Sequence, residues 1–549
     1  FDPASIGLVT GAMSLPTITV TGFVPLGAPT NVPRGRVSSA YQFVDNLSWA
    51  RRQHTYKVGG EYRRAIVNSF NDQLARGQLN FNRAATVCPP DVSPNDCQSQ
   101  TASINSLADF LAGRVSTSGT AILRGATRRD TFTNNFGLFV QDDWKVAPRL
   151  MLNLGLRYEY LGVFREQYDR LANFLPASGL VQVGGPGLDS LYKPDYNNFA
   201  PRIGLAFDLT GSGHTILRGG YGFYYDTPSQ DYFLLQGFQN GGPGSPALNP
   251  LPGLGVFNLT FPANALIPYG PNVPIFGAAG GSLPTTNISI FGVDPNLRTP
   301  YIQNYNLNLQ HELRPGSVIQ LGYIGSRGTK LYRVRDINQA TPGPSGTRQQ
   351  RRPLNAVYPQ FSYINYLETS ANSNYNALQT TFKQRLSRGL NLYAEYTWSK
   401  SIDDASNGIY SGTRGVSFPQ DSYNLRAERA VSGFDLRHRF SLNFTYDVNF
   451  IPGLFGSLPK RLTEGWQLGG IYTGQSGSPI TPFLSIDNSG TGELNDRPNL
   501  VGDPNSGPQG PRGWFNEGAF AAPAGNSFGN SPRNVIIGPA YHSVDFSVN

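Results

Sequence analysis

The stretch LMLNLGLRYEY, residues 150–160, decides the fold. Its even-numbered residues are all leucine or tyrosine, whereas its odd-numbered residues are polar or glycine, apart from Met151. A period of two places these sets on opposite faces of a β-strand. Residues 132–140 alternate in the same way, and Ala147-Pro148-Arg149 between the two stretches is typical of a turn, where proline needs no ladder hydrogen bond. The sequence therefore predicts a hairpin with one apolar and one polar face.

The same pattern recurs along the whole chain. Further hairpins are predicted for 41–49 with 56–64, 199–208 with 216–225, 301–312 with 318–324, 376–386 with 390–398, and 439–448 with 466–472. Single strands are expected at 17–24 and 544–548. This gives about fourteen strands, each near the length that a tilted strand needs to cross a bilayer.

The predicted connections alternate between short and long. Within hairpins they are mostly a few residues, whereas 227–298 is a long segment rich in Gly, Pro, Asn and Phe. Compact soluble domains rarely contain long connections without regular structure, but outer-membrane barrels have them on the outer side and short turns on the periplasmic side. We therefore predict an all-β protein with a large antiparallel transmembrane β-barrel. A soluble β-sandwich or propeller is the alternative, although it gives no reason for the asymmetry of the connections.

The two faces of the predicted strands differ in chemistry. The apolar face ends in aromatic residues, as expected at membrane interfaces: Tyr158, Tyr160, Tyr225, Tyr396, Trp398, Tyr446, Trp466 and Tyr472. The other face is too polar for a dry core, and its charged members are predicted to line a wet lumen. These lumen candidates are Arg157, Glu159, Arg202, Arg218, Lys383, Arg385, Glu395, Arg439 and Asp447.

Composition excludes several classes of protein. Of 549 residues, 63 are Gly and 42 are Pro, which argues against long helices, and 12% aromatic residues argue against a disordered chain. The net charge of +8 is modest, and no block of like charges predicts nucleic-acid binding. Adjacent acids such as Asp142 and Asp143 point to opposite faces of a strand and cannot act together as acid and base. We expect neither an enzyme nor a bound cofactor.

Several stretches resemble the barrel of TonB-dependent outer-membrane receptors of the Oar-like group. They are FVQDDW (139–144), LNLGLRYE (152–159), LRGGYG (217–222), GYIGSRG (322–328), NYNALQ (374–379), YTWSKS (396–401), FDLRHRF (434–440) and GWQL (465–468). The resemblance implies a 22-strand barrel, an N-terminal plug with a box that pairs with TonB, and a preceding regulatory-like domain. Plug, box and regulatory-like domain are not found, so we expect residues 1–549 to be an incomplete barrel truncated at both ends. Residues 1–38 would be a lead-in strand and loop, and 227–298 an extracellular loop.

The resemblance implies a receptor in the outer membrane of a Gram-negative-type bacterium. With its plug it would take up a large or scarce solute, driven by the TonB complex. Its expected partners are the lipid bilayer, TonB and an unknown solute, with no nucleic acid. A surface adhesion barrel and a passive porin are the alternatives.

Two local features carry further predictions. Cys88 and Cys97 flank a loop with three prolines and are expected to form a disulfide in an oxidising compartment. No metal site is assigned, but one loop groups oxygen ligands that suit calcium: Asp487, Asn488, Glu493 and Asp496. The loop lacks the bidentate Glu of an EF-hand, so an ordinary polar turn is the alternative.

Overall fold

The fold is described from a computed structural model of the chain. It describes residues 15–27, 29, 34–71, 78–82, 102–113, 115–116, 121–124, 129–169, 171–230, 233, 255–258, 288–385, 389–406, 418–448 and 465–549. Cys88 and Cys97 lie outside these residues, as does most of the predicted loop 227–298, so both predictions remain predictions.

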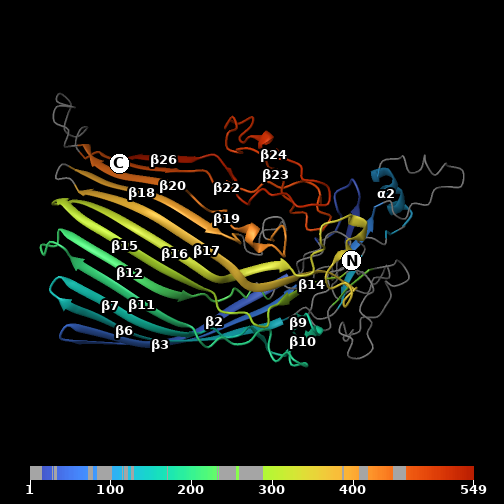
Figure 1. Cartoon of the computed structure of the whole chain (residues 1–549), viewed down its shortest axis with the longest axis horizontal. Coiled ribbons are helices and arrows are strands. Elements are labelled where there is room, and N and C mark those ends of the chain that lie inside the picture. The colour runs from blue at the N-terminus through green and yellow to red at the C-terminus, as the bar shows by residue number, and fades with distance from the viewer. Residues whose placement is uncertain are drawn as a thin grey trace.

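A single large antiparallel sheet, called the wall below, dominates the described part of the chain (Figure 1). The sheet has sixteen strands, of which thirteen follow one another from edge to edge, while β8 (Arg165–Glu166), β14 (Ile288–Val293) and β19 (Ala430–Val431) attach to them. The thirteen are β2 (Arg34–Arg51), β3 (His54–Asn71), β6 (Arg129–Ala147), β7 (Leu150–Tyr160), β11 (Phe199–Asp208), β12 (Thr215–Tyr225), β15 (Tyr301–Arg314), β16 (Ser317–Asp336), β17 (Phe361–Arg385), β18 (Leu390–Asp403), β20 (His438–Asp447), β21 (Gln467–Gln475) and β26 (Tyr541–Val548). The prediction of a large antiparallel transmembrane sheet is confirmed.

All six predicted hairpins form. In the hairpin that decides the fold, Phe136 lies opposite Tyr160 and Val140 opposite Leu156, so the apolar rows of β6 and β7 share one face. Among the described connections, the short turns gather at one end of the wall and the long ones at the other (Figure 1). Because outer-membrane barrels have short turns on the periplasmic side, we call the end with the long connections the outer end.

The predicted strand at 17–24 does not belong to the wall, which corrects the count of fourteen. Residues Thr17–Val20 form β1, which pairs in parallel with β4 (Gln78–Phe81). Together with β5 (Ala121–Arg124) and β13 (Gly255–Asn258) they make a separate sheet of four strands, accompanied by α2 (Ala102–Leu111). Alternation over four residues cannot tell which sheet a strand joins, because pairing partners are distant in sequence.

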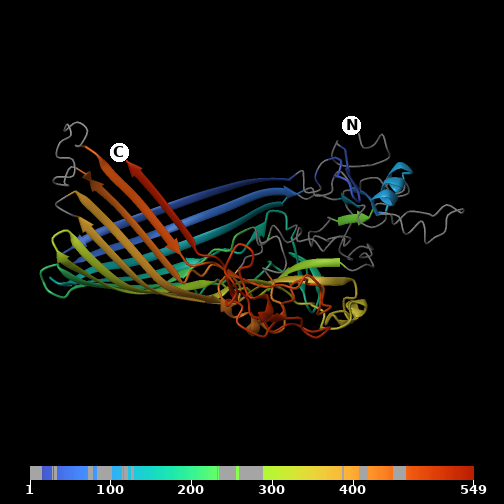
Figure 2. The ribbon, with the colours of Figure 1, turned by 90° about the horizontal axis from the view of Figure 1, so that it is seen from above.

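The wall is curled but not closed in the described residues. Figure 2 shows an open trough, with β2 at one edge and β26 at the other. Helices contribute little here, and none in the described residues is long and apolar enough to cross a membrane.

Glycines opposite aromatic residues let the wall pack tightly. Gly470 on β21 lies directly opposite Phe444 on β20, and a Cβ atom added at Gly470 would lie 2.5 Å from the Phe444 ring. Gly35 opposite Phe70 shows the same arrangement. Each ring occupies the space that a side chain on the facing glycine would need, which gives Gly470 and Gly35 a packing role.

Some wall strands are much longer than a bilayer requires. β16 has 20 residues and β17 has 25, whereas about ten are needed. Their outer parts join the described long connections in a region that we call the outer layer. It comprises residues 161–169, 171–198, 288–300, 331–372, 418–437 and 476–540. Its short elements are β9 (Ala172–Leu175), β10 (Gly179–Gln182), β22 (Pro479–Ile480), β23 (Asn499–Leu500), β24 (Phe520–Ala521), β25 (Ile536–Ile537), η4 (Ser345–Thr347), η5 (Gln349–Arg351), η6 (Leu425–Glu428) and η8 (Glu517–Ala519).

The outer layer has a hydrophobic core of its own. Phe174 on β9, Leu191 in the following connection, Val293 on β14 and Leu367 on β17 are fully or almost fully buried in one cluster. Burial of such side chains stabilises each by about 1.5–3 kcal/mol relative to exposure. The long connections are thus a folded layer at the end of the wall.

Candidate functional site

The charged residues predicted to line a lumen all lie on one face of the wall. In an antiparallel sheet directly opposed residues point to the same side. Arg202 on β11 lies opposite Gly155, which shares the odd-numbered face of β7 with Arg157 and Glu159. Arg218 on β12 lies opposite Ala206, which is four residues along β11 from Arg202 and on the same face.

The register carries this face across the remaining strands. From Arg218 it passes through β15 and β16 to β17, whose residues Lys383 and Arg385 are on it. Glu395 lies opposite Thr381, and Arg439 opposite Thr397. Asp447 on β20 has the same parity as Arg439. We call this the polar face; that it lines a lumen remains a prediction.

The opposite, apolar face is exposed rather than covered. Leu156 is 46% exposed, Leu321 47% and Phe546 63%, although a soluble protein would bury such a band of side chains. The predicted interface aromatic residues that belong to wall strands share this face with them, whereas Trp466 lies just before β21. A wall that exposes apolar side chains on the face away from its charges suits lipid and excludes the soluble sandwich.

One charged cluster on the polar face joins three strands. Arg157 forms ion pairs with Glu159 on its own strand and with Glu61 on β3, the latter at 3.2 Å between Nη2 and Oε2. Gln42 on β2 donates a hydrogen bond of 2.7 Å to Glu61. Gly137 on β6 lies between these strands, and an added Cβ would be 2.6 Å from the Arg157 guanidinium. The glycine thus leaves the space that the arginine occupies.

Sequence reasoning named Arg157 and Glu159 but missed Glu61. Glu61 lies in the predicted strand 56–64, so its place on the sheet could be expected. Its pairing with Arg157 depends on the register of β3, β6 and β7, which cannot be read from the sequence. The same holds for Lys57, whose Nζ lies 2.7 Å from Asp143 on β6. Asp142 and Asp143 point to opposite faces of β6, as expected, and Asp142 contacts His54 at 2.8 Å.

Two hollows open on the polar face. The smaller, of about 180 Å³, lies over glycines of β7, β11 and β12, between Arg202, Tyr224, Asn304 and Asn306. The Arg202 guanidinium stacks 4.5 Å above the Tyr224 ring.

The larger hollow, of about 350 Å³, lies on β17, β18 and β20, and we call it the β18 hollow. Its lining is polar with two aromatic rings: Tyr375, Gln379, Glu395, Thr397, Ser399, Ser401, Phe434, Asp435, Leu436, Arg439 and Ser441. It thus brings together Glu395 and Arg439, two of the predicted lumen residues. Phe434, from the connection before β20, is 64% exposed beside it.

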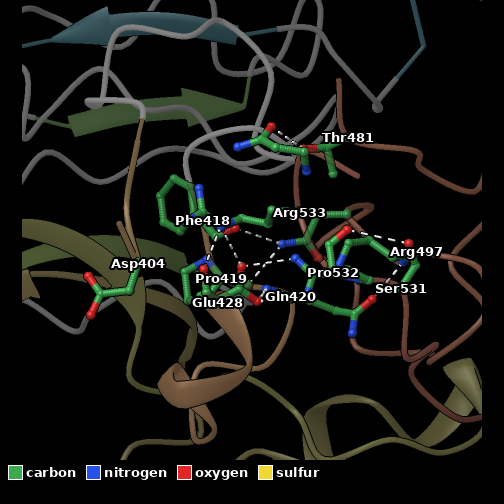
Figure 3. Close-up of polar contacts among 12 residues, drawn as sticks. Asp404, Phe418, Pro419, Gln420, Glu428, Thr481, Arg497, Ser531, Pro532 and Arg533 are labelled. Carbon is green, nitrogen blue, oxygen red and sulfur yellow. Dashed lines mark hydrogen bonds and ion pairs between the residues drawn. The ribbon is translucent and has the colours of Figure 1, made fainter. Parts of the chain in front are cut away.

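Buried ion pairs hold the outer layer together beyond the β18 hollow (Figure 3). Arg497 donates two hydrogen bonds of 2.9 Å to the Glu428 carboxylate. Arg533 approaches the same carboxylate at 3.3 Å and lies 2.8 Å from Asp403 at the end of β18. All four side chains are at least 89% buried. A carboxylate that receives two arginines fixes three separate segments relative to one another.

Gln420 adds neutral contacts to the same junction. Its backbone N–H donates to Glu428 at 3.0 Å, its amide donates to the Gly529 carbonyl at 2.9 Å, and its side-chain oxygen accepts from the backbone N–H of Arg497 at 2.6 Å. This junction could not be predicted from the sequence, because its partners lie up to 130 residues apart.

The predicted calcium loop is closed by contacts within the protein. Asp487 forms an ion pair with Arg348 at 2.6 Å, and Asp496 accepts a hydrogen bond of 2.7 Å from the backbone N–H of Ser489. Burial raises the pKa of Asp496 above its usual range. Asn488 turns its amide to the carbonyls of Ala524 and Ser527. In the described residues, no group of three or more His, Cys, Asp or Glu side chains is placed to hold a metal ion. The arrangement is that of a polar turn, and calcium binding remains a prediction.

An exposed apolar face, an opposed polar face and short turns at one end define a β-sheet built to stand in a membrane. The model of the outer membrane beta barrel domain family matches residues 3–549, and the chain belongs to that family. The protein is therefore located in the outer membrane.

The chain is similar to several solved structures of outer-membrane transporters and receptors. The outer membrane transporter YddB from Escherichia coli is 12% identical, with a TM-score of 0.47 over 83% of this chain and 44% of that chain. The ferric enterobactin receptor PfeA from Pseudomonas aeruginosa is 12% identical, with a TM-score of 0.41 over 89% and 47%. The FrpB iron transporter from Neisseria meningitidis is 11% identical, with a TM-score of 0.37 over 81% and 45%. The chain thus spans less than half the length of each. No curated protein matches it.

Proposed function

We propose that the chain is the barrel-forming part of a TonB-dependent outer-membrane receptor of the Oar-like group, which takes up a large or scarce solute. One observation carries the transport role. The polar face continues without interruption across membrane-spanning strands and bears the β18 hollow. Residues so placed are suited to a hydrated path, since charges on the lipid side would be costly.

The dependence on TonB rests on the sequence motifs that resemble the Oar-like group. In that proposal the plug and its TonB box belong to the full-length protein, and the outer layer meets the solute first. The polar face then lines the lumen, and the TonB complex supplies the energy.

The test uses the full-length protein in its own bacterium. Strains lacking the receptor gene, the tonB gene or both are grown in defined medium, and depletion of peptides, oligosaccharides and metal chelates is measured by mass spectrometry. We expect one solute class to remain undepleted in all three mutants and to be depleted again on complementation. Depletion that requires the receptor but not TonB would instead establish a porin.

An adhesion barrel gives a third result. Loss of the receptor would then leave all depletion unchanged and would reduce attachment of cells to a surface. Either of these two results would overturn the proposal.

A further inference from the structure

We propose that the β18 hollow binds the two charged ends of a short zwitterionic peptide. The inference rests on the proposed function and deepens it by naming the class of solute. It starts from two opposite charges that share one hollow without neutralising each other.

Glu395 and Arg439 are diagonal neighbours on adjacent strands. Glu395 lies opposite Ser441, and Arg439 opposite Thr397. Side chains in this relation have Cα atoms about 7–8 Å apart, so a small ligand with two charged ends can reach both. No ion pair joins the two charges in the described residues.

Both charges are available to a ligand. The Arg439 side chain is exposed and forms no hydrogen bond or ion pair in the described part of the chain. Glu395 accepts one hydrogen bond of 3.3 Å, from the hydroxyl of Tyr393. Asp435, the other acid in the lining, is already occupied, because it accepts a 2.6 Å hydrogen bond from the backbone N–H of Ser401 and is 5% exposed.

The rest of the lining suits a peptide between these charges. Gln379 and the hydroxyls of Thr397, Ser399 and Ser441 can exchange hydrogen bonds with peptide groups. Phe434, largely exposed at the rim, offers an apolar surface to a side chain. A volume of about 350 Å³ is within the range of small-ligand pockets.

The chemistry favours a zwitterion over a neutral oligosaccharide. Arg439 can bind a terminal carboxylate with two parallel hydrogen bonds, and Glu395 can accept from a terminal ammonium. A neutral sugar would leave a separated cation and anion without charged partners, which weakens binding when they lose water. The occupant we infer is a peptide of two or three residues with free ends.

The experiment uses the purified full-length receptor in detergent. The probe is the fraction of a casein digest below 500 Da, and the peptides retained after rapid size exclusion are quantified by mass spectrometry. The matched probe is the same fraction with acetylated amino groups and amidated carboxyl groups. We expect retention of the free peptides and at least tenfold lower retention of the blocked ones.

Variants identify the site. Arg439→Gln and Glu395→Gln should each reduce retention of free peptides at least tenfold. Lys400→Gln is the control. Lys400 is an exposed cation on β18, the strand of Glu395, and it does not line the hollow. Circular dichroism establishes that each variant is folded.

The inference is overturned if free peptides are not retained, if blocked peptides are retained equally, or if both hollow variants retain peptides like the native protein. Retention of maltotriose in place of peptides would also overturn it. Failure of the proposed function is separate: peptide retention by purified protein can persist even if uptake by cells proves independent of TonB.

Discussion

The wall and the outer layer reach stability by opposite means. In the wall, Leu156 and Phe546 stay exposed on the apolar face, and backbone ladders bind each strand to its neighbours. In the outer layer, Phe174 and Leu367 are fully buried, and Arg497 and Glu428 pair away from water. The apolar side chains of the wall contact lipid, whereas those of the outer layer are buried against one another in a core of their own. The two regions should therefore unfold independently of each other.

The largest effect is expected for Glu428→Ala in the outer layer. The change leaves the Arg497 guanidinium buried without its carboxylate, which typically costs about 3–5 kcal/mol. We expect protease cleavage within residues 476–540, while the wall keeps its resistance to detergent on gels. Glu517→Ala, at an exposed position of the same region, is the control and should not change cleavage. If the wall were lost together with the outer layer, the two regions would not be independent.

The next effect concerns the wall and its two faces. Leu154→Arg places a charge on the lipid side and should lower the free energy of unfolding by about 2–4 kcal/mol near the bilayer midplane. Asn153→Arg, the adjacent residue on the polar face, should be tolerated. Denaturant titration of protein refolded in lipid vesicles measures both. The opposite order would reverse the assignment of the faces.

A smaller loss is expected from crowding within the wall. Gly470→Ala brings a Cβ to within 2.5 Å of the Phe444 ring, and such overpacking costs about 1–3 kcal/mol. Gly346→Ala in the outer layer, where an added Cβ meets no atom within 4 Å, should change stability little. The same titration compares them. Equal effects would show that the ring over Gly470 moves aside freely.

The smallest effect concerns pH. Because burial raises the pKa of Asp496, the neutral form is favoured in the folded protein. The stability that the neutral Asp496 carboxyl contributes to the folded protein is fully present below the ordinary pKa of 3.8. It is lost as pH rises through the raised pKa of the folded state. Asp496→Asn, which stays uncharged at every pH, should remove this loss. Protease sensitivity of the outer layer between pH 4 and 7 measures it.

Calcium provides a further comparison in the same assay. If the loop binds calcium, calcium chloride should protect the native protein at pH 7 but not the Asp496→Asn variant. No protection would leave the loop as a polar turn.

The strand pairs of the wall were predictable because their signal is local. The alternation in residues 150–160 sets the faces of β7, and short turns such as Pro148-Arg149 force neighbouring stretches to pair. Once the pairs are antiparallel, the face of Glu395 or Arg439 follows from parity alone. The large antiparallel barrel-type sheet and its two faces could be predicted for this reason.

The outer layer was not predictable, because its contacts join distant segments without a period. Nothing near Glu428 identifies Arg497 or Arg533 as its partners, and nothing near Phe174 predicts that it packs with β14 and β17. The prediction that residues 17–24 form a strand of the wall was wrong for the same reason.

The sequence by itself determined that this protein is a membrane wall with one polar and one apolar face, because a period of two is a property of each strand alone. Only the tertiary structure decided which charges share the β18 hollow and which connections fold into the outer layer. Those depend on register between strands and on burial between segments, which arise only when the whole chain is assembled.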